Sequence, residues 1–140
     1  MNLRELFQKD VVTIEPQGTI ADAVGKMKHK AVGAVVVVDK EKVVGILTDR
    51  DVALALAVNK VSADAPVCEI MTKNVVTIWD DQGIFNATQY FVGRNFRRLP
   101  IIDRKDKLVG MITTDDLFAL LTRELFNVSK ALEPSLVEKM

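Results

Sequence analysis

Residues 43–51 read VVGILTDRD, and residues 108–116 repeat this pattern as LVGMITTDD. Upstream of both stretches, the tetrapeptide VVTI also occurs twice, at residues 11–14 and again at residues 75–78. The copies are offset by 64 positions up to one inserted residue near Asp106, and by 65 positions beyond it. A repeat of this length indicates two copies of one supersecondary unit, each of which folds in the same way.

Each copy is expected to form a strand, a helix, a hairpin of two strands and a final helix. The β-branched VVTI segment predicts the first strand, and apolar residues at helical spacing from Ile20 and from Ile84 predict the first helix. A charged turn between two apolar strands is typical of a hairpin. The other expected elements are lead-in segments at 3–8 and 67–72, second strands at 34–38 and 99–102, third strands at 43–48 and 108–113, and second helices that begin at Asp49 and Thr114.

The predicted fold class is α/β, of the α+β kind, with two pseudo-symmetric repeats. A unit of about 55 residues buries little apolar surface by itself. The strand at residues 35–38 is apolar on both faces, so its sheet needs cover on both sides. We therefore expect the repeats to pack sheet to sheet, with two related clefts at an interface of the kind that often binds ligands. We divide the chain into residues 1–62, residues 63–124 and a helical extension at residues 125–140.

The composition argues against several classes of protein. The 140 residues include 19 basic and 19 acidic side chains, so the formal net charge is zero and no nucleic-acid partner is expected. No apolar run is long enough to span a bilayer and no signal peptide is recognised, so we expect a cytoplasmic protein without a membrane partner. A single cysteine, Cys68, and a single histidine, His29, argue against an internal disulfide, a His/Cys zinc site and a catalytic triad. We expect no cofactor.

The sharpest motif is a repeated Gly-x-x-Thr-x-x-Asp at the end of the third strand. It comprises Gly45, Thr48 and Asp51 in the first copy and Gly110, Thr113 and Asp116 in the second. A threonine at a helix start with an acidic residue three positions later is typical of a capping box. The same carboxylate, facing a cleft, can accept hydrogen bonds from a ribose hydroxyl pair, and the helix N-terminus favours a phosphate. Both interpretations stay open, because the threonine can cap while the aspartate faces a ligand.

These motifs resemble those of a tandem pair of cystathionine-β-synthase-type (CBS) domains, known as a Bateman module. The resemblance covers about residues 3–121, and it rests on EIMTKNVVTI at 69–78, FRRLPIID at 96–103 and the two motif-bearing strands. It implies the two-repeat fold, and it implies binding of an adenosine nucleotide (AMP, ADP or ATP) or, as in some members, S-adenosylmethionine. In the family, the threonine and aspartate hold the ribose, while backbone and apolar groups of the other repeat surround the adenine.

The resemblance assigns one ligand site to each motif. The first would join Thr48 and Asp51 to Val75, Val76, Arg97, Arg98, Leu99 and Pro100. The second would join Thr113 and Asp116 to Val11, Val12, Gly33, Ala34 and Val35. Arg98 matches a basic residue that contacts phosphate in members similar to the γ subunit of AMP-activated protein kinase, and a guanidinium binds phosphate through paired hydrogen bonds. We expect the first site to be the main one, since the second has no equivalent arginine.

The C-terminal stretch has a pattern of its own. Its apolar residues recur at near-helical spacing, at Leu117, Leu121, Leu125, Val128 and Leu132. This spacing predicts an amphipathic helix from Asp115 to Leu132, which Glu133 and Pro134 would end. Such a helix either packs back on its own module or docks a second protomer. The resemblance implies a homodimer.

The sequence favours a nucleotide sensor over an enzyme. An adenosine nucleotide that bridges the repeats would favour one packing and alter the surface offered to an unidentified effector protein. Two alternatives stay open: a phosphate-free ligand such as S-adenosylmethionine, and a structural or adaptor dimer in which both motifs only cap helices. Nucleotide hydrolysis is disfavoured, because the chain has neither a Gly-rich phosphate loop nor a metal–carboxylate cluster.

Overall fold

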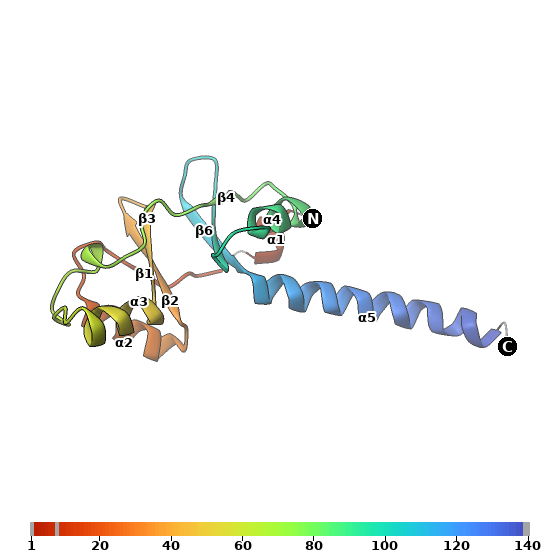
Figure 1. Ribbon diagram of the computed structural model, residues 1–140. Helices are drawn as coiled ribbons and strands as arrows, with labels where there is room; N and C mark the ends of the chain where they lie inside the picture. The colour runs from red at the N-terminus through yellow and green to blue at the C-terminus, as the bar shows by residue number, and fades with distance from the viewer. Residues whose placement is uncertain (1, 8, 139–140) are drawn as a thin grey trace.

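A computed structural model describes residues 2–7 and 9–138 of the chain, with side chains up to residue 133. The first half of the chain contributes one three-stranded sheet and several helices (Figure 1). Its elements are α1 (Leu3–Phe7), β1 (Thr13–Ile14), α2 (Ile20–Lys30), β2 (Ala34–Asp39), β3 (Lys42–Thr48), α3 (Asp49–Ala53) and a π-helical segment, η1 (Leu54–Val58). The second half contributes a short 3-10 turn, η2 (Val67–Glu69), followed by β4 (Ile78–Trp79), α4 (Ile84–Phe91), β5 (Arg98–Ile102), β6 (Leu108–Thr113) and α5 (Thr114–Glu138).

Both sheets have the same topology, which confirms the internal repeat. In the first sheet, β1 pairs in parallel with β2, and β2 pairs antiparallel with β3. The strands β4, β5 and β6 repeat this order. The register also matches, because Ala34 lies opposite Thr48 just as Arg98 lies opposite Thr113. A register shift near the end of β2 recurs at the equivalent position of β5.

The first strand of each repeat is shorter than the VVTI pattern predicts. β1 covers only Thr13–Ile14, and β4 covers Ile78–Trp79 rather than residues 75–78. Each is an edge strand with one neighbour in its sheet. The residues before β1 lead from α1, which packs on the other repeat, and this path limits the ladder to one further bond, from the Val36 amide to the Val12 carbonyl at 3.0 Å.

The first helix of each repeat begins as the sequence predicts, at Ile20 and Ile84. On α2, the Thr19 hydroxyl accepts a hydrogen bond from the Asp22 amide at 3.0 Å, and Asp22 Oδ2 accepts one from the Thr19 amide at 3.4 Å. This capping box satisfies amides that have no partner within the helix. The buried stripe of α2 then lies against the sheet.

Each hydrophobic core contains a lead-in segment from the other half of the chain. Leu3 of α1 is fully buried among the apolar side chains of β4, β5 and β6. Val67 of η2 is fully buried among those of β1, β2 and β3. Backbone hydrogen bonds also join each segment to the opposite half of the chain. The Leu3 amide donates to the Gln82 carbonyl at 2.9 Å, and the Val67 amide donates to the Gly18 carbonyl at 2.8 Å. The two repeats are therefore joined by a reciprocal exchange of segments.

The exchanged segment that follows η2 passes so close to β3 that it requires a glycine there. Ile46 and Thr72 exchange two backbone hydrogen bonds, at 3.0 and 2.9 Å. A Cβ atom at Gly45 would overlap the Met71 side chain and lie 3.1 Å from the Thr72 carbonyl oxygen. The glycine of the repeated motif thus allows the chain from the second repeat to pair with the first.

The second face of each sheet is also covered. Val35 and Val37 lie in the core beneath α2, whereas Val36 points to the opposite face of the pleat and is still fully buried. Pro100 of β5 is likewise fully buried, on the face opposite its core neighbours. In Figure 1 both sheets lie between α2 and α3 on one side and α1 and α4 on the other. The expected sheet-to-sheet architecture is confirmed.

α5 continues through Pro134 to Glu138, so the predicted end at Glu133 and Pro134 is wrong. Proline fixes φ near the helical value and removes one N–H donor. The carbonyl that loses this partner belongs to Lys130, an exposed residue whose carbonyl can bond water instead. Beyond its first turns, α5 projects away from both sheets (Figure 1). Across the described residues, neither α5 nor any other helix has the length and apolar character needed to cross a membrane.

Truncation of Leu3 tests the exchange of segments. Leu3→Ala removes buried methyl groups from the core of the second repeat, so we expect the free energy of unfolding to fall by about 2–5 kcal/mol. Glu5→Ala, at an exposed position of the same helix, should change it by less than about 0.5 kcal/mol. Urea denaturation followed by circular dichroism measures both. A Leu3→Ala protein as stable as the wild type would contradict the packing described for α1.

Candidate functional site

The two Thr-x-x-Asp motifs form the same capping box at equivalent helix starts. The Thr48 amide donates to Asp51 Oδ2 at 3.0 Å, and the Asp51 amide donates to Thr48 Oγ1 at 3.1 Å. Thr113 and Asp116 make the same two bonds at 3.0 Å each. The capping interpretation of the motif is therefore confirmed in both repeats.

Capping holds the two aspartates in place without using all of their acceptor atoms. In each box Oδ2 accepts the threonine amide, whereas Oδ1 has no hydrogen-bond partner among the described residues. Asp51 and Asp116 are half-buried, as are their threonines. A carboxylate oxygen fixed at a helix start can accept a charge-assisted hydrogen bond from a ligand hydroxyl. The caps are thus compatible with the ligand-binding interpretation as well.

Lys9 is a neighbour of the second motif that sequence reasoning did not select. Its Nζ lies 3.6 Å from Asp116 Oδ2. Because Lys9 precedes Val11 and Val12 by a few residues, this ion pair brings the predicted partner segment close to Asp116. The recurrence of lysine at position 73, one repeat later, is a signal that could have identified it. An ion pair this exposed contributes about 1 kcal/mol or less to stability.

Arg98 lies where the two repeats meet. Its backbone pairs with Thr113 across the β5–β6 ladder. Its Nη2 lies 3.4 Å from the position that a Cβ atom would occupy at Gly33 in the first repeat. Asp49 Oδ2 lies 3.1 Å from the same position, and the Asp49 amide donates to the Gly33 carbonyl at 2.9 Å. Gly33, Arg98 and the starts of both capped helices therefore form one seam between the repeats.

The other predicted site residues differ in burial. Val35 and Leu99 are fully buried in the two cores, so a ligand could contact only their backbone. Pro100 is fully buried between the sheets. The Arg97 carbonyl accepts the Thr114 amide at 3.0 Å, which repeats the bond between Gly33 and Asp49. Those with at least part of their surface exposed are Val11, Val12, Ala34, Val75, Val76 and Arg97.

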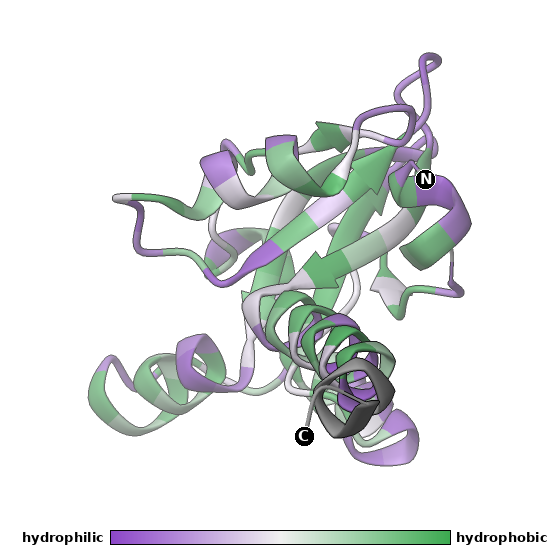
Figure 2. Cartoon of the chain, turned by 90° about the vertical axis from the view of Figure 1, so that its right-hand side faces the viewer, coloured by the Kyte–Doolittle hydropathy of each residue, from purple (hydrophilic) through white to green (hydrophobic). Residues whose placement is uncertain are grey.

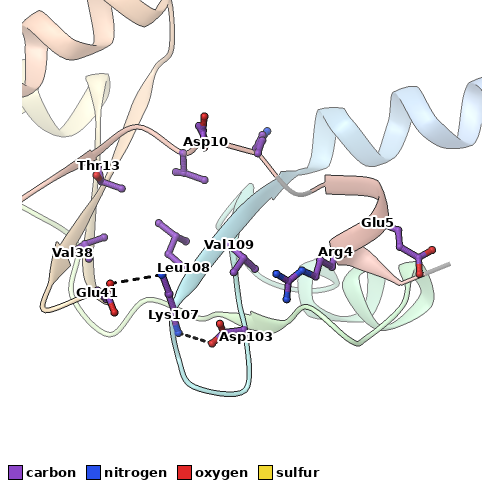
Figure 3. A pocket seen from close by; sticks show the side chains of 12 residues that line it. Arg4, Glu5, Asp10, Thr13, Val38, Glu41, Asp103, Lys107, Leu108 and Val109 are labelled. Carbon is purple, nitrogen blue, oxygen red and sulfur yellow. Dashed lines mark hydrogen bonds and ion pairs between the residues drawn. The ribbon is translucent and has the colours of Figure 1, made fainter.

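A cleft of about 980 Å³ opens beside β1 and runs toward the hairpin turns (Figure 3). Of the predicted site residues, Val11 lines it, whereas the threonines and aspartates of the two motifs do not. Its walls carry both signs of charge, and Val11 shares the apolar part with Val38, Leu108 and Val109. The cleft is therefore adjacent to the predicted second site but does not coincide with the motif residues.

Some of the charged groups of this cleft are held by contacts at the two hairpin turns. The backbone amides of Lys107 and Lys105 donate to Asp103 Oδ1 at 3.0 and 2.8 Å, and these bonds hold the pKa of the Asp103 carboxyl below its ordinary value. Lys107 Nζ lies 3.7 Å from Glu41 Oε1 and so links the two hairpin turns. No group of three or more His, Cys, Asp or Glu side chains in the described ranges could hold a metal ion.

Comparison with known proteins identifies the repeated unit. The family model for the CBS domain matches residues 3–58 and again residues 67–123. The CBS domain-containing protein YhcV of Bacillus subtilis is 34% identical over 116 residues, which cover 83% of this chain and 82% of that protein. An uncharacterised protein of Methanopyrus kandleri, MK0525, is 31% identical over 119 residues, which cover 84% of this chain but only 61% of the relative's length.

Solved structures show the same architecture. The CBS domain pair of protein MJ0100, in complex with 5′-methylthioadenosine and S-adenosyl-L-methionine, gives a TM-score of 0.78 at 26% identity, with 89% of this chain and 98% of that chain covered. PAE2072 of Pyrobaculum aerophilum, complexed with AMP, gives a TM-score of 0.75 at 21% identity, with coverage of 83% and 89%, a likeness that shows the fold. Because the family model matches both repeats and solved pairs share their arrangement, this chain belongs to the CBS domain family and carries two CBS repeats.

Proposed function

We propose that this CBS pair is a regulatory module that binds an adenosine nucleotide, AMP, ADP or ATP, between its repeats. The observation that carries the proposal is the pair of matching capping boxes, in which Asp51 and Asp116 each keep one carboxylate oxygen without a partner among the described residues. Membership of the family supports the proposal, as do the adenosine-containing ligands of the MJ0100 pair.

The aspartates would hold the ribose. A ribose diol presents hydroxyl donors, and Oδ1 of Asp51 or Asp116 can accept one while Oδ2 stays bound to the threonine amide. The adenine would then contact the opposite repeat, at Val75, Val76 and the backbone of β5 in the first site, and at Val11, Val12 and residues 33–35 in the second. A ligand that contacts residues of both repeats would stabilise one arrangement of the repeats at the seam.

Arg98 would hold the phosphate. Its guanidinium stays charged at any working pH and matches phosphate geometry with paired donors. Arg98 pairs with Thr113 in its own repeat and its Nη2 comes near Gly33 in the other, and this position between the repeats supports a phosphate contact. S-adenosylmethionine carries no phosphate, so dependence on Arg98 separates the two classes of adenosine ligand.

The module would act by linkage rather than by catalysis. A ligand shifts a conformational equilibrium only by its differential affinity for the two states, which typically corresponds to a coupling of about 1–3 kcal/mol. Here the states would differ in how the repeats meet at the seam. We propose that the module is a cytoplasmic homodimer and that an unidentified effector protein reads the change.

Substitution of the motif aspartates tests the ribose contacts. Asp51→Asn and Asp116→Asn should each weaken binding at their own site about tenfold to hundredfold, because a charge-assisted hydrogen bond contributes about 1.5–3 kcal/mol. Isothermal titration calorimetry with AMP, ADP, ATP and S-adenosylmethionine at fixed salt measures this loss. Asp22→Asn is the matched control, since Asp22 closes the same kind of capping box on α2, away from the motifs.

The control should bind within about twofold of the wild type. Equal losses in Asp22→Asn and Asp51→Asn would show that the cap, and not a ligand contact, causes the effect. If folded wild-type protein, freed of co-purified ligand, binds none of the four compounds, the proposal fails and the adaptor dimer becomes the better description.

Removal of the Arg98 charge tests the phosphate contact. Arg98→Met should reduce AMP affinity about tenfold or more and leave affinity for adenosine nearly unchanged, because only the phosphate loses its partner. Arg94→Met, at an exposed arginine in the loop after α4, is the control. The same calorimetric titrations measure both variants. An equal loss for AMP and adenosine would place Arg98 outside the phosphate site.

A further inference from the structure

A row of apolar side chains runs along the part of α5 that projects from the module. Its members are Phe118, Leu121, Leu125, Val128 and Leu132, which follow one another at spacings of three, four, three and four residues. Each is between 50% and 75% exposed. Figure 2, in which α5 points toward the viewer, colours many residues of this helix as hydrophobic. Exposed apolar surface of this extent marks an interaction site.

The row continues the side of α5 that packs on its own module, because Leu121 follows the buried Leu117 by four residues. Leu117 is buried in the core of the second repeat, and Leu120 contributes to a small hollow with residues of α1. After Leu120, every described residue of α5 up to Glu133 is exposed. The module therefore covers this side of α5 only in its first turns and leaves the row exposed.

We propose that this row pairs with α5 of a second copy of the chain, as a two-helix coiled coil. The proposal rests on, and deepens, the homodimer of the proposed function by naming its contact surface. Apolar residues at alternating spacings of three and four repeat every 3.5 residues on average, which is the period at which two α-helices supercoil and interlock their side chains. A helix that lies on a sheet or a globular surface instead needs a broader stripe of period 3.6.

Charge on the row's flanks favours a second copy over a different protein. The residues beside the row are Thr122, Glu124, Ser129 and Ala131, of which only Glu124 is charged. Coiled coils that select a different partner do so with complementary charges at such positions. The basic residues Arg123 and Lys130 lie on the opposite side of the helix, where they would not meet their counterparts. Two copies can therefore approach with little like-charge repulsion.

The size of the row is adequate for a specific contact. Burial of these side chains on both helices would remove on the order of 1,000 Å² of mainly apolar surface from water. Stable, specific interfaces bury at least about 1,000–1,200 Å² of total surface. The row therefore approaches this size without any contribution from the rest of the module.

Sedimentation equilibrium of the full-length chain tests the pairing. We expect a dimer for the wild type. Association of Leu125→Lys should be at least about tenfold weaker, because a charge would enter the apolar contact between the two α5 helices. Phe126→Lys is the matched control: its side chain is 60% exposed, lies off the row and contacts Lys130, whose Nζ is 5.5 Å from the ring centroid. The control should remain dimeric. Circular dichroism confirms that each variant is folded, and Val128→Lys replaces Leu125→Lys if that variant does not fold.

The outcomes separate this inference from the proposed function. A monomeric wild type overturns both the helix pair and the homodimer. A dimer that persists in Leu125→Lys and Val128→Lys overturns the helix pair alone and leaves the homodimer to another surface. AMP titration of the same samples is an independent readout, because a charge at position 125 lies far along α5 from the seam. If the same samples are also titrated with ADP and ATP, a wild type that binds none of the three nucleotides overturns the nucleotide sensor without affecting the pairing result.

Discussion

Leu3 and Val67 occupy equivalent positions in the two repeats, yet each is buried in the core of the opposite repeat. The rest of the structure depends on this exchange. A unit of about 55 residues buries little apolar surface by itself, and here neither core is complete without the other half of the chain. Matching backbone bonds and the close pass at Gly45 hold the exchanged segments against their host sheets. The repeats therefore have to fold together, with their sheets face to face.

That constraint also creates the candidate site. Because the sheets face one another, the ends of β3 and β6 bring two capped helices to a common seam, and Arg98 of one repeat approaches Gly33 of the other. The same threonine and aspartate that satisfy the helix start hold a carboxylate oxygen in a fixed position. In the proposed function, Oδ2 of each motif aspartate caps its helix, and Oδ1 would bind the ligand. A ligand bound at this seam would therefore stabilise one arrangement of the two repeats, whose contact the exchanged segments maintain.

The repeat made much of the fold predictable. Its offset predicted two equivalent sheets, and the apolar strand β2 predicted cover on both faces, both of which are confirmed. The short β1 and β4 could not be read from VVTI, because strand length at an edge depends on where the preceding chain comes from. The extension of α5 beyond Pro134 depends on solvent around one carbonyl, which a local pattern does not encode.

For the site, the sequence predicted the motif and its caps, and the family resemblance implied that each motif shares a site with the opposite repeat, but two particular contacts were not predicted. The repeated lysine at positions 9 and 73 marks Lys9, but its pairing with Asp116 and the approach of Arg98 to Gly33 join residues far apart in the chain and are seen in the packed structure. The ligand roles of the site residues, and the division at residues 62 and 124, stay predictions.

The most direct test of the central claim is a titration of isotopically labelled protein with AMP, followed through its backbone amide chemical shifts. A ligand that bridges the repeats should shift the amides of Asp51 or Asp116 together with those of Gly33 and Arg98, so that both halves of the chain respond at one stoichiometry. Shifts confined to a single repeat, shifts limited to the cleft around Lys107 and Asp103, or no shifts with AMP and, in parallel titrations, with ADP and ATP would contradict the account.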